Sequence, residues 1–220
     1  GHWVAPIDGA AFPVINPATE EAYATISLGG MKDAEAAIAA AKSAFPTWSI
    51  TTVETRIQYL EKLLAVYEER MQDMAQTISS EMGAPIDMSL SDQAGSGRGH
   101  LKAFIRALGS IEFQRPLRPG VEGQDIAFEA AGVAALITPW NWPMNQVVLK
   151  VGAALAAGCT MVLKPSEIAP MSSILFAECI DAADFPAGVF NMVNGDGAGV
   201  GTLLSAHPDI DIVSFTGSTR

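Results

Sequence analysis

The chain divides into two parts by its pattern of apolar residues. From residue 132 onward, short uninterrupted apolar runs alternate with longer helical stretches, as at Val133–Ile137 and Thr160–Leu163. Such runs are typical of strands buried on both faces, and further strands are predicted at Val189–Val193 and Ile212–Thr216. Strands and helices that alternate at this spacing predict an α/β fold, with a parallel sheet and flanking helices.

The helix between the first two strands has two different faces. It is predicted to begin at Pro143, which suits the first turn, and to end at Gly158. The face expected to pack on the sheet is aliphatic and consists of Met144, Val147, Val148, Val151 and Leu155. The opposite face consists of Trp142, Asn145, Gln146 and Leu149, with Lys150 on its flank. A helix facing water would be charged there, so this face suits the wall of a covered pocket.

The part of the chain before residue 117 is predicted to be mainly helical. Residues 1–30 hold several prolines and glycines between β-prone pieces, which predicts strands and turns. Lys32–Phe45 is rich in alanine and is predicted as a helix that ends before Pro46.

A long amphipathic stretch follows. Thr51 and Glu54 form a predicted capping box, and apolar residues then recur every three or four positions up to Met82. The length predicts two helices broken near Glu69–Gln72, and the methionine and aromatic residues are interpreted as core. Residues 86–99 contain several glycines, which predicts a flexible or tightly turned region.

Between this stretch and the sheet, a helix is predicted at His100–Phe113, and a strand outside the main βαβ series is predicted at Asp125–Ala130. After the second strand of the sheet, Pro170–Ala183 is a predicted helix, and a turn at Asn194–Gly197 leads to a short helix ending near Ala206. These patterns predict a segment packing on the sheet domain, an extended arm or linker, and the partial sheet domain itself, with the bounds 1–116, 117–131 and 132–220.

Composition narrows the class of protein. The 220 residues contain 13 Lys and Arg against 24 Asp and Glu, a net charge of −11, which argues against binding to nucleic acid. No apolar stretch is long enough to span a membrane, and no signal peptide is visible in the sequence, although an upstream segment could have been removed. The two cysteines fit a reducing compartment. We therefore expect a soluble cytoplasmic protein.

Three ordered motifs resemble those of the aldehyde dehydrogenase superfamily. They are PWNWP at Pro139–Pro143, KPSE at Lys164–Glu167 and FTGST at Phe215–Thr219. The resemblance covers nearly the whole chain, but only the N-terminal part of such an enzyme. It implies a Rossmann-like sheet that binds NAD(P), truncated before the catalytic domain, and a reaction that oxidises an aldehyde to a carboxylic acid. It also implies a homodimer or homotetramer, in which residues 117–131 form an arm for oligomer contact. An ordinary linker is the alternative for that segment.

The resemblance assigns two catalytic residues. Asn141 would donate from its amide to the substrate oxygen that becomes negative during the reaction. Its neighbours Thr138, Pro139 and Trp140 would lie, with Asn141 itself, against the nicotinamide half of the cofactor. Lys150 would relay protons, with a pKa lowered by partial burial. From the sequence alone, Asn141 could simply cap the helix and Lys150 could be a solvated side chain.

The KPSE motif would hold the adenosine ribose. The Glu167 carboxylate can accept from ribose hydroxyls, Lys164 can donate to the same sugar, and Ser166 lies between them. Glu167 favours NAD because a carboxylate repels a 2′-phosphate, while Lys164 leaves NADP open. A salt bridge between Lys164 and Glu167 is the simpler interpretation.

The last motif would bind the pyrophosphate. Gly217 and Ser218, after Phe215 and Thr216, would offer backbone N–H groups and a hydroxyl at the start of a helix. A plain turn is the alternative for so short a motif. Gly195 and Gly199 resemble the loop near the adenine, but the glycine spacing there departs from the usual dinucleotide fingerprint.

The remaining candidates concern substrate and metal. Trp142, Asn145, Gln146 and Leu149 match positions that line the substrate passage of the family, and a tryptophan there suggests an aromatic or otherwise apolar aldehyde. Cys159 and Cys179 are interpreted as small core residues. The three histidines are too scattered to suggest a metal site.

The family's cysteine nucleophile and glutamate base follow FTGST, so we expect the 220-residue chain alone to be inactive and to be a piece of a longer polypeptide. Two other functions stay open. One is a non-catalytic nucleotide-binding or oligomerisation module, and the other is an acyl-phosphate or acyl-CoA reductase of the same fold.

Overall fold

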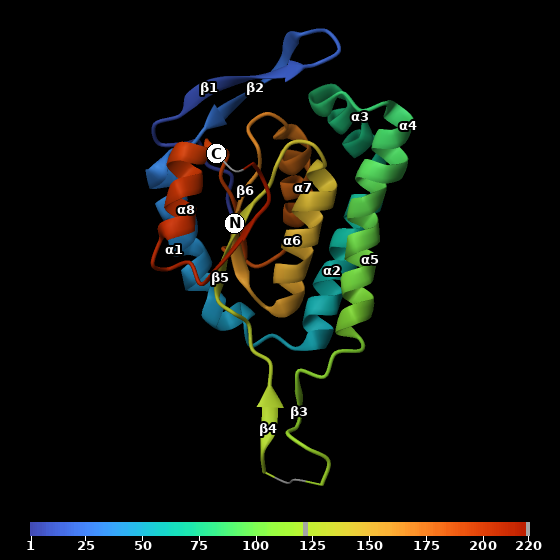
Figure 1. Ribbon diagram of the computed structural model, residues 1–220, viewed down its shortest axis with the longest axis vertical. Helices are drawn as coiled ribbons and strands as arrows, with labels where there is room; N and C mark the ends of the chain where they lie inside the picture. Colours follow the sequence, from blue (N-terminus) through green and yellow to red (C-terminus); the bar gives the residue numbers. More distant parts are fainter. Residues whose placement is uncertain (121–122, 219–220) are drawn as a thin grey trace.

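The computed structural model describes residues 1–120 and 123–218, and it forms three layers around a parallel sheet (Figure 1). The strands are β1 (Ala10–Asn16), β2 (Glu21–Leu28), β3 (Gln114–Pro116), β4 (Asp125–Ala127), β5 (Val133–Ile137), β6 (Thr160–Lys164), β7 (Phe190–Met192) and β8 (Ile212–Phe215). The helices are α1 (Met31–Trp48), α2 (Val53–Glu69), α3 (Met71–Met82), α4 (Ile86–Met88), α5 (Gly95–Leu108), α6 (Pro143–Ala157), α7 (Met171–Ala182) and α8 (Thr202–Ala206). Two π-helical turns, η1 (Ser89–Ala94) and η2 (Gly197–Gly201), precede α5 and α8.

The central sheet has four parallel strands in the order β7-β6-β5-β8. The chain moves outward from β5 to β6 and β7, and then returns to the other side of β5 to form β8. The strand order therefore reverses between β5 and β8. The predicted α/β class and parallel sheet are confirmed.

Alternate residues of β5 and β6 enter two different cores, as a strand buried on both faces requires. Leu136 and Met161 belong to the core shared with α2, α5, α6 and α7. Ala135 and Val162 belong to the core shared with α1 and α8. Figure 1 shows α1 and α8 on one side of the sheet, and α6 and α7, with α2 and α5 outside them, on the other.

One prediction about the sheet is wrong. The fourth strand, expected to be buried, is largely exposed: Ile212, Val213 and Phe215 keep 47%, 41% and 58% of their surface. The physical reason is position. β8 is the outer strand of the described sheet and has β5 as its neighbour on one side only.

The helical prediction for the N-terminal part is confirmed in outline and corrected in three places. Pro46 lies within the last turn of α1 instead of after the helix, where it costs a single backbone hydrogen bond. The N-cap of α2 is Thr52, whose hydroxyl accepts from the Thr55 N–H at 3.2 Å, whereas Thr51 donates to the Trp48 carbonyl. The predicted break near Glu69–Gln72 is confirmed, because α2 and α3 meet at Arg70.

The third correction concerns residues 86–99, which are helical and not a turned region. The following helix, α5, begins at Gly95 and ends at Leu108, earlier than the predicted Phe113. Packing explains the glycines. A Cβ at Gly97 would lie 2.4 Å from the Tyr67 hydroxyl and 3.2 Å from the Val148 side chain on α6.

Helices α5 and α6 approach closely at a second point. A Cβ at Gly152 on α6 would lie 2.7 Å from the ring of Phe104 on α5. Each of the two helices thus has a glycine where a side chain of the other helix packs against it. The glycines of α5 and α6 supply room for this contact rather than flexibility.

An antiparallel pair of strands projects from the body (Figure 1). β3 pairs with β4 from Gln114↔Ala127 to Pro116↔Asp125. The strand predicted at Asp125–Ala130 is therefore present over Asp125–Ala127, outside the parallel sheet. Residues 121 and 122 of this arm lie outside the described residues. The predicted domain bounds stay a prediction. One hydrophobic core contains residues from before and after the arm, and the ring centroids of Tyr67 and Phe176 in it lie 6.1 Å apart.

Candidate cofactor and catalytic site

The carboxyl ends of three strands meet at one edge of the sheet. The Thr138 N–H, just after β5, donates to the Lys164 carbonyl at the end of β6 at 3.2 Å. The Thr216 N–H, just after β8, donates to the Ile137 carbonyl at the end of β5 at 3.1 Å. Ligands of open parallel sheets bind at this edge, where the strand order reverses. The structure therefore brings together the three predicted motifs that follow β5, β6 and β8.

Asn141 lies in the short turn between β5 and α6. Among the described residues no side chain caps α6, whose N-cap position is Trp142, so the capping interpretation of Asn141 is wrong. Its backbone carbonyl accepts from the Gln93 amide on η1 at 3.5 Å. Gln93 is fully buried, and its Oε1 atom has no partner within the described residues. Sequence reasoning missed Gln93, because nothing in its local sequence distinguishes it from a solvated glutamine.

Lys150 reaches from α6 to the outer strand β8. Its ammonium group donates to the Ser214 hydroxyl at 2.8 Å. Partial burial lowers the pKa of Lys150, which is the direction that was predicted. A lysine with a lowered pKa and a hydroxyl partner can hold or pass on a proton.

The KPSE motif forms a compact polar group after β6. The Lys164 ammonium and the Glu167 carboxylate lie 2.9 Å apart, so the salt bridge considered from the sequence is present. The Lys164 side chain is 5% exposed, whereas Glu167 keeps 26% and remains open to a ligand. Ser166 is buried, and its hydroxyl accepts from the Ile168 N–H at 3.3 Å.

The loop after β8 is more open. Phe215, Gly217 and Ser218 are exposed, and Thr216 is partly buried. A Cβ at Gly217 would lie 2.6 Å from the Phe215 ring, so this position is restricted to glycine while the ring keeps its place. Thr219 and Arg220 lie outside the described residues, and the helix expected to start there is not described.

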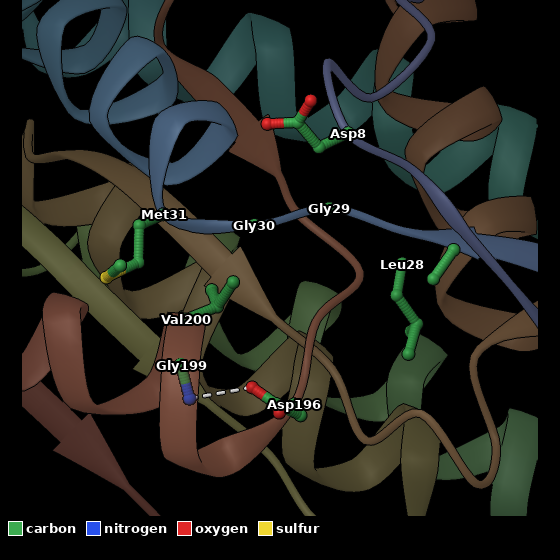
Figure 2. A pocket seen from close by; sticks show the side chains of 9 residues that line it. Asp8, Leu28, Gly29, Gly30, Met31, Asp196, Gly199 and Val200 are labelled. Carbon is green, nitrogen blue, oxygen red and sulfur yellow. Dashed lines mark hydrogen bonds between the residues drawn. The ribbon is translucent and has the colours of Figure 1, made fainter.

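Gly195 and Gly199 follow β7, which pairs with β6 on the side away from β5, so their loop begins next to the strand that carries the KPSE motif. Figure 2 shows a cavity of about 350 Å³ between the segment Asp196–Val200 and the link from β2 to α1. The Asp196 carboxylate accepts from the Gly199 N–H at 2.7 Å and so shapes its rim. A larger hollow of about 790 Å³ lies between the N-terminal residues, α1 and α7, away from Asn141.

The predicted substrate face of α6 is partly open. Leu149 is exposed, while Trp142, Asn145 and Gln146 are partly buried. The aliphatic residues of the opposite stripe are all buried, as predicted. A further residue joins this face: the His100 Nε2 atom on α5 lies 2.7 Å from the Asn145 Oδ1 atom. Sequence reasoning missed His100 because it treated the histidines only as metal ligands or triad members.

Both cysteines are free and buried, which confirms their interpretation as core residues. Burial raises the pKa of the Cys179 thiol to about 11, so the thiolate is scarce near neutral pH. In residues 1–120 and 123–218, no cluster of three or more His, Cys, Asp or Glu could hold a metal ion. Within the same residues, the helices are too short or too polar to cross a membrane.

Comparisons with known proteins agree with this geometry. The sequence profile of the aldehyde dehydrogenase family matches residues 3–220. A curated relative from a Pseudomonas species, 3-succinoylsemialdehyde-pyridine dehydrogenase, is 48% identical over 221 residues, which cover 100% of this chain and 46% of the relative. The chain thus spans about half the length of the curated relatives it matches.

Solved structures agree over the same extent. The aldehyde dehydrogenase of Bartonella henselae has 57% identity and a TM-score of 0.97, covering 100% of this chain and 46% of that one. Aldehyde dehydrogenase C of Pseudomonas syringae, solved with NAD⁺ and octanal, has 45% identity and a TM-score of 0.92, covering 96% and 43%. From its motifs, its fold and a profile match along almost its entire length, this chain belongs to the aldehyde dehydrogenase family.

Proposed function

We propose that the protein containing this chain oxidises an aldehyde to a carboxylic acid with NAD as hydride acceptor. The observation that supports this most is the meeting of three polar loops at the edge of the sheet, where the strand order reverses. Asn141, the Lys164–Glu167 pair and Gly217 all lie in these loops. The alternative of a reductase of acyl phosphates or acyl-CoA has no observation here in its favour.

The described residues fit a dinucleotide. The Thr138 hydroxyl, just after β5, is buried and has no partner within the described residues, so its hydrogen-bonding capacity is unused at the edge where the three motifs meet. Glu167 is open enough to accept from two ribose hydroxyls, and Lys164 beside it can donate to the same sugar. Two related structures were solved with NAD⁺, those of aldehyde dehydrogenase C and of betaine aldehyde dehydrogenase from Staphylococcus aureus. NAD, when bound, accepts the hydride that the aldehyde loses.

The chain's own residues then have separate tasks. The Asn141 amide donates to the carbonyl oxygen as it gains negative charge. Lys150 holds or passes on a proton with Ser214 as its partner. Trp140 lies against the nicotinamide half of the cofactor, and Trp142 and Leu149 line the substrate passage. Gly217 with Ser218 binds the pyrophosphate through N–H and hydroxyl groups.

The nucleophile and the base that complete this reaction come from outside the 220 residues. Cys159 is 5% exposed and Cys179 is fully buried, so neither thiol can reach a substrate at the edge of the sheet. We therefore propose that these residues alone bind NAD without turning over aldehyde. We also propose a cytoplasmic homodimer or homotetramer in which the β3–β4 arm forms a contact between subunits. Leu117, just after β3, and Phe128, just after β4, are exposed apolar side chains that such a contact would cover.

The test compares the full-length protein with the isolated 220 residues. NAD binding is followed through tryptophan fluorescence, to which Trp140 and Trp142 contribute, and turnover is followed through NADH formation with a panel of aldehydes. We expect turnover by the full-length protein alone, and its strong reduction by Asn141→Ala. A full-length protein that binds NAD but oxidises none of the aldehydes contradicts the proposed reaction. Turnover by the isolated 220 residues contradicts the proposed division of the site.

A further inference from the structure

A hydrogen bond joins two helices beside the proposed catalytic turn. His100 on α5 and Asn145 on α6 are both partly buried, and the His100 Nε2 and Asn145 Oδ1 atoms lie 2.7 Å apart. Asn145 lies on the same face of α6 as Trp142, Gln146 and Leu149. In the proposed function this face lines the path of the aldehyde to Asn141, so the pair would form part of the wall of that path.

The chemistry of the two groups orients the amide. The Oδ1 atom of asparagine can only accept, so His100 Nε2 must carry the hydrogen and donate it. This bond occupies the amide oxygen of Asn145. The two N–H donors of its Nδ2 atom then point away from His100 and are available to another acceptor.

The helices hold this pair at a fixed spacing. Gly97 on α5 contacts Val148 on α6, where a Cβ would be a tight fit. Gly152 on α6 contacts Phe104 on α5, where there is no room for a Cβ. A donor that is oriented by a neighbour and mounted on two closely packed helices is preorganised, so it loses little freedom when it binds a ligand.

We propose that His100 and Asn145 select aldehydes that carry a hydrogen-bond-accepting oxygen a few carbons from the reacting carbonyl. Asn145 is the residue that touches the substrate, and His100 positions its amide. This inference rests on the proposed function, because it places an aldehyde along α6. It adds to the sequence-based expectation of an apolar aldehyde: Trp142 would contact the carbon chain and Asn145 the oxygen.

The test uses two aldehydes of equal length that differ at one carbon. Pentanal and 4-oxopentanal are compared as substrates of the full-length enzyme by kcat/KM. We expect a preference of about 10-fold or more for 4-oxopentanal, because a polar site rejects an analogue that leaves its donors unpaired. Succinic semialdehyde tests whether a carboxylate oxygen can replace the ketone oxygen as the hydrogen-bond acceptor.

Asn145→Asp is the most informative variant, since it keeps an oxygen for His100 but removes the N–H donors. We expect it to abolish the preference, because kcat/KM for 4-oxopentanal falls further than kcat/KM for pentanal. His100→Leu should reduce the preference about threefold, because the amide can then rotate. Arg98→Ala, exposed on the same helix, is the control and should leave the ratio unchanged.

The ratio of two substrates on one sample does not depend on how much of a variant folds. Equal kcat/KM values for the two aldehydes, or an unchanged ratio in Asn145→Asp, overturns this inference while leaving the proposed function intact. Failure to oxidise any aldehyde of the panel overturns the proposed function and this inference with it, whereas failure with these two alone overturns only the inference.

Discussion

The Lys150 ammonium on α6 donates to the Ser214 hydroxyl on β8 at 2.8 Å, and this bond crosses the place where the strand order of the sheet reverses. Burial lowers the pKa of Lys150. A side chain in this position can serve chemistry at the turn that follows β5, while Ser214 keeps it from pointing into solvent.

Replacing this lysine should slow the reaction without weakening cofactor binding. We expect Lys150→Met to lower kcat of the full-length enzyme about 100-fold, which is the usual range for loss of a proton-transfer group. NAD affinity, measured by tryptophan fluorescence, should change less than twofold. Lys102→Met is the matched control, because Lys102 pairs with Glu68 on the surface. A parallel loss of NAD affinity in Lys150→Met would assign the lysine to cofactor binding instead.

Glu167 should decide between the two nicotinamide cofactors. Its carboxylate repels a 2′-phosphate, and it also pairs with Lys164 at 2.9 Å. We expect Glu167→Gln to raise the NADP-to-NAD ratio of kcat/KM by about 10-fold, which corresponds to roughly 1.4 kcal/mol. The reason is that the repulsion is lost and the Lys164 charge becomes free for the phosphate. An unchanged ratio would show that the ribose lies elsewhere.

The glycines of α5 should respond in opposite directions to the same substitution. Gly97→Ala places a Cβ 2.4 Å from the Tyr67 hydroxyl, so we expect a loss of stability of about 1–3 kcal/mol. Gly99→Ala is the matched control, because nothing lies within 4 Å of its Cβ and alanine favours the helix by about 0.5–1 kcal/mol. The midpoints of thermal unfolding test this. Equal midpoints for the two variants would contradict the close approach of the helices.

Glu81 should make stability depend on pH. It is 2% exposed, and its carboxylate accepts from the N–H groups of Met171 and Ser172 at the start of α7, at 2.6 and 3.0 Å. Burial nevertheless raises the pKa of Glu81 to about 7. The folded state thus binds this proton more tightly than the unfolded one, where the pKa is about 4.5. The contribution of Glu81 is largest below pH 4.5 and is lost as the pH rises to about 7.

The change over this interval amounts to about 3 kcal/mol for the pKa shift given. We expect Glu81→Gln to flatten the dependence of the unfolding midpoint between pH 4.5 and about pH 7. Glu61→Gln, at an exposed position of α2, should leave the slope as it is. If both variants keep the original slope, Glu81 is not the group that titrates.

The parts of the fold that the sequence predicts well are those with local signals. The unit from β5 through α6 to β6 has uninterrupted apolar runs, a proline at the start of the helix and Gly158 at its end, with φ 81°. The prediction of a flexible or turned region at residues 86–99 was wrong. Gly97 lies in a helix and makes room for Tyr67, which is 30 positions earlier in the chain. The exposure of β8 also depends on what lies beside the strand, and no pattern within Ile212–Thr216 carries that information.

The candidate site likewise has parts that the sequence predicts and parts that depend on packing between distant elements. The motifs after β5, β6 and β8 could be placed at one edge of the sheet, because the carboxyl ends of parallel strands meet there. The contacts of Gln93 with Asn141 and of His100 with Asn145 join residues more than 40 positions apart. Such contacts follow from how α5 and η1 pack on α6, which sequence spacing does not predict.

The close approach at Gly97 and Gly152 limits how the proposed substrate preference could be changed. At both glycines the backbone of one helix touches a side chain of the other, and an added Cβ would force the two apart, so the spacing of the helices is set by these contacts. A new substrate preference would have to come from single substitutions on the facing surfaces, with the distance between the helices unchanged. Candidate positions are His100, Asn145, Gln146 and Leu149.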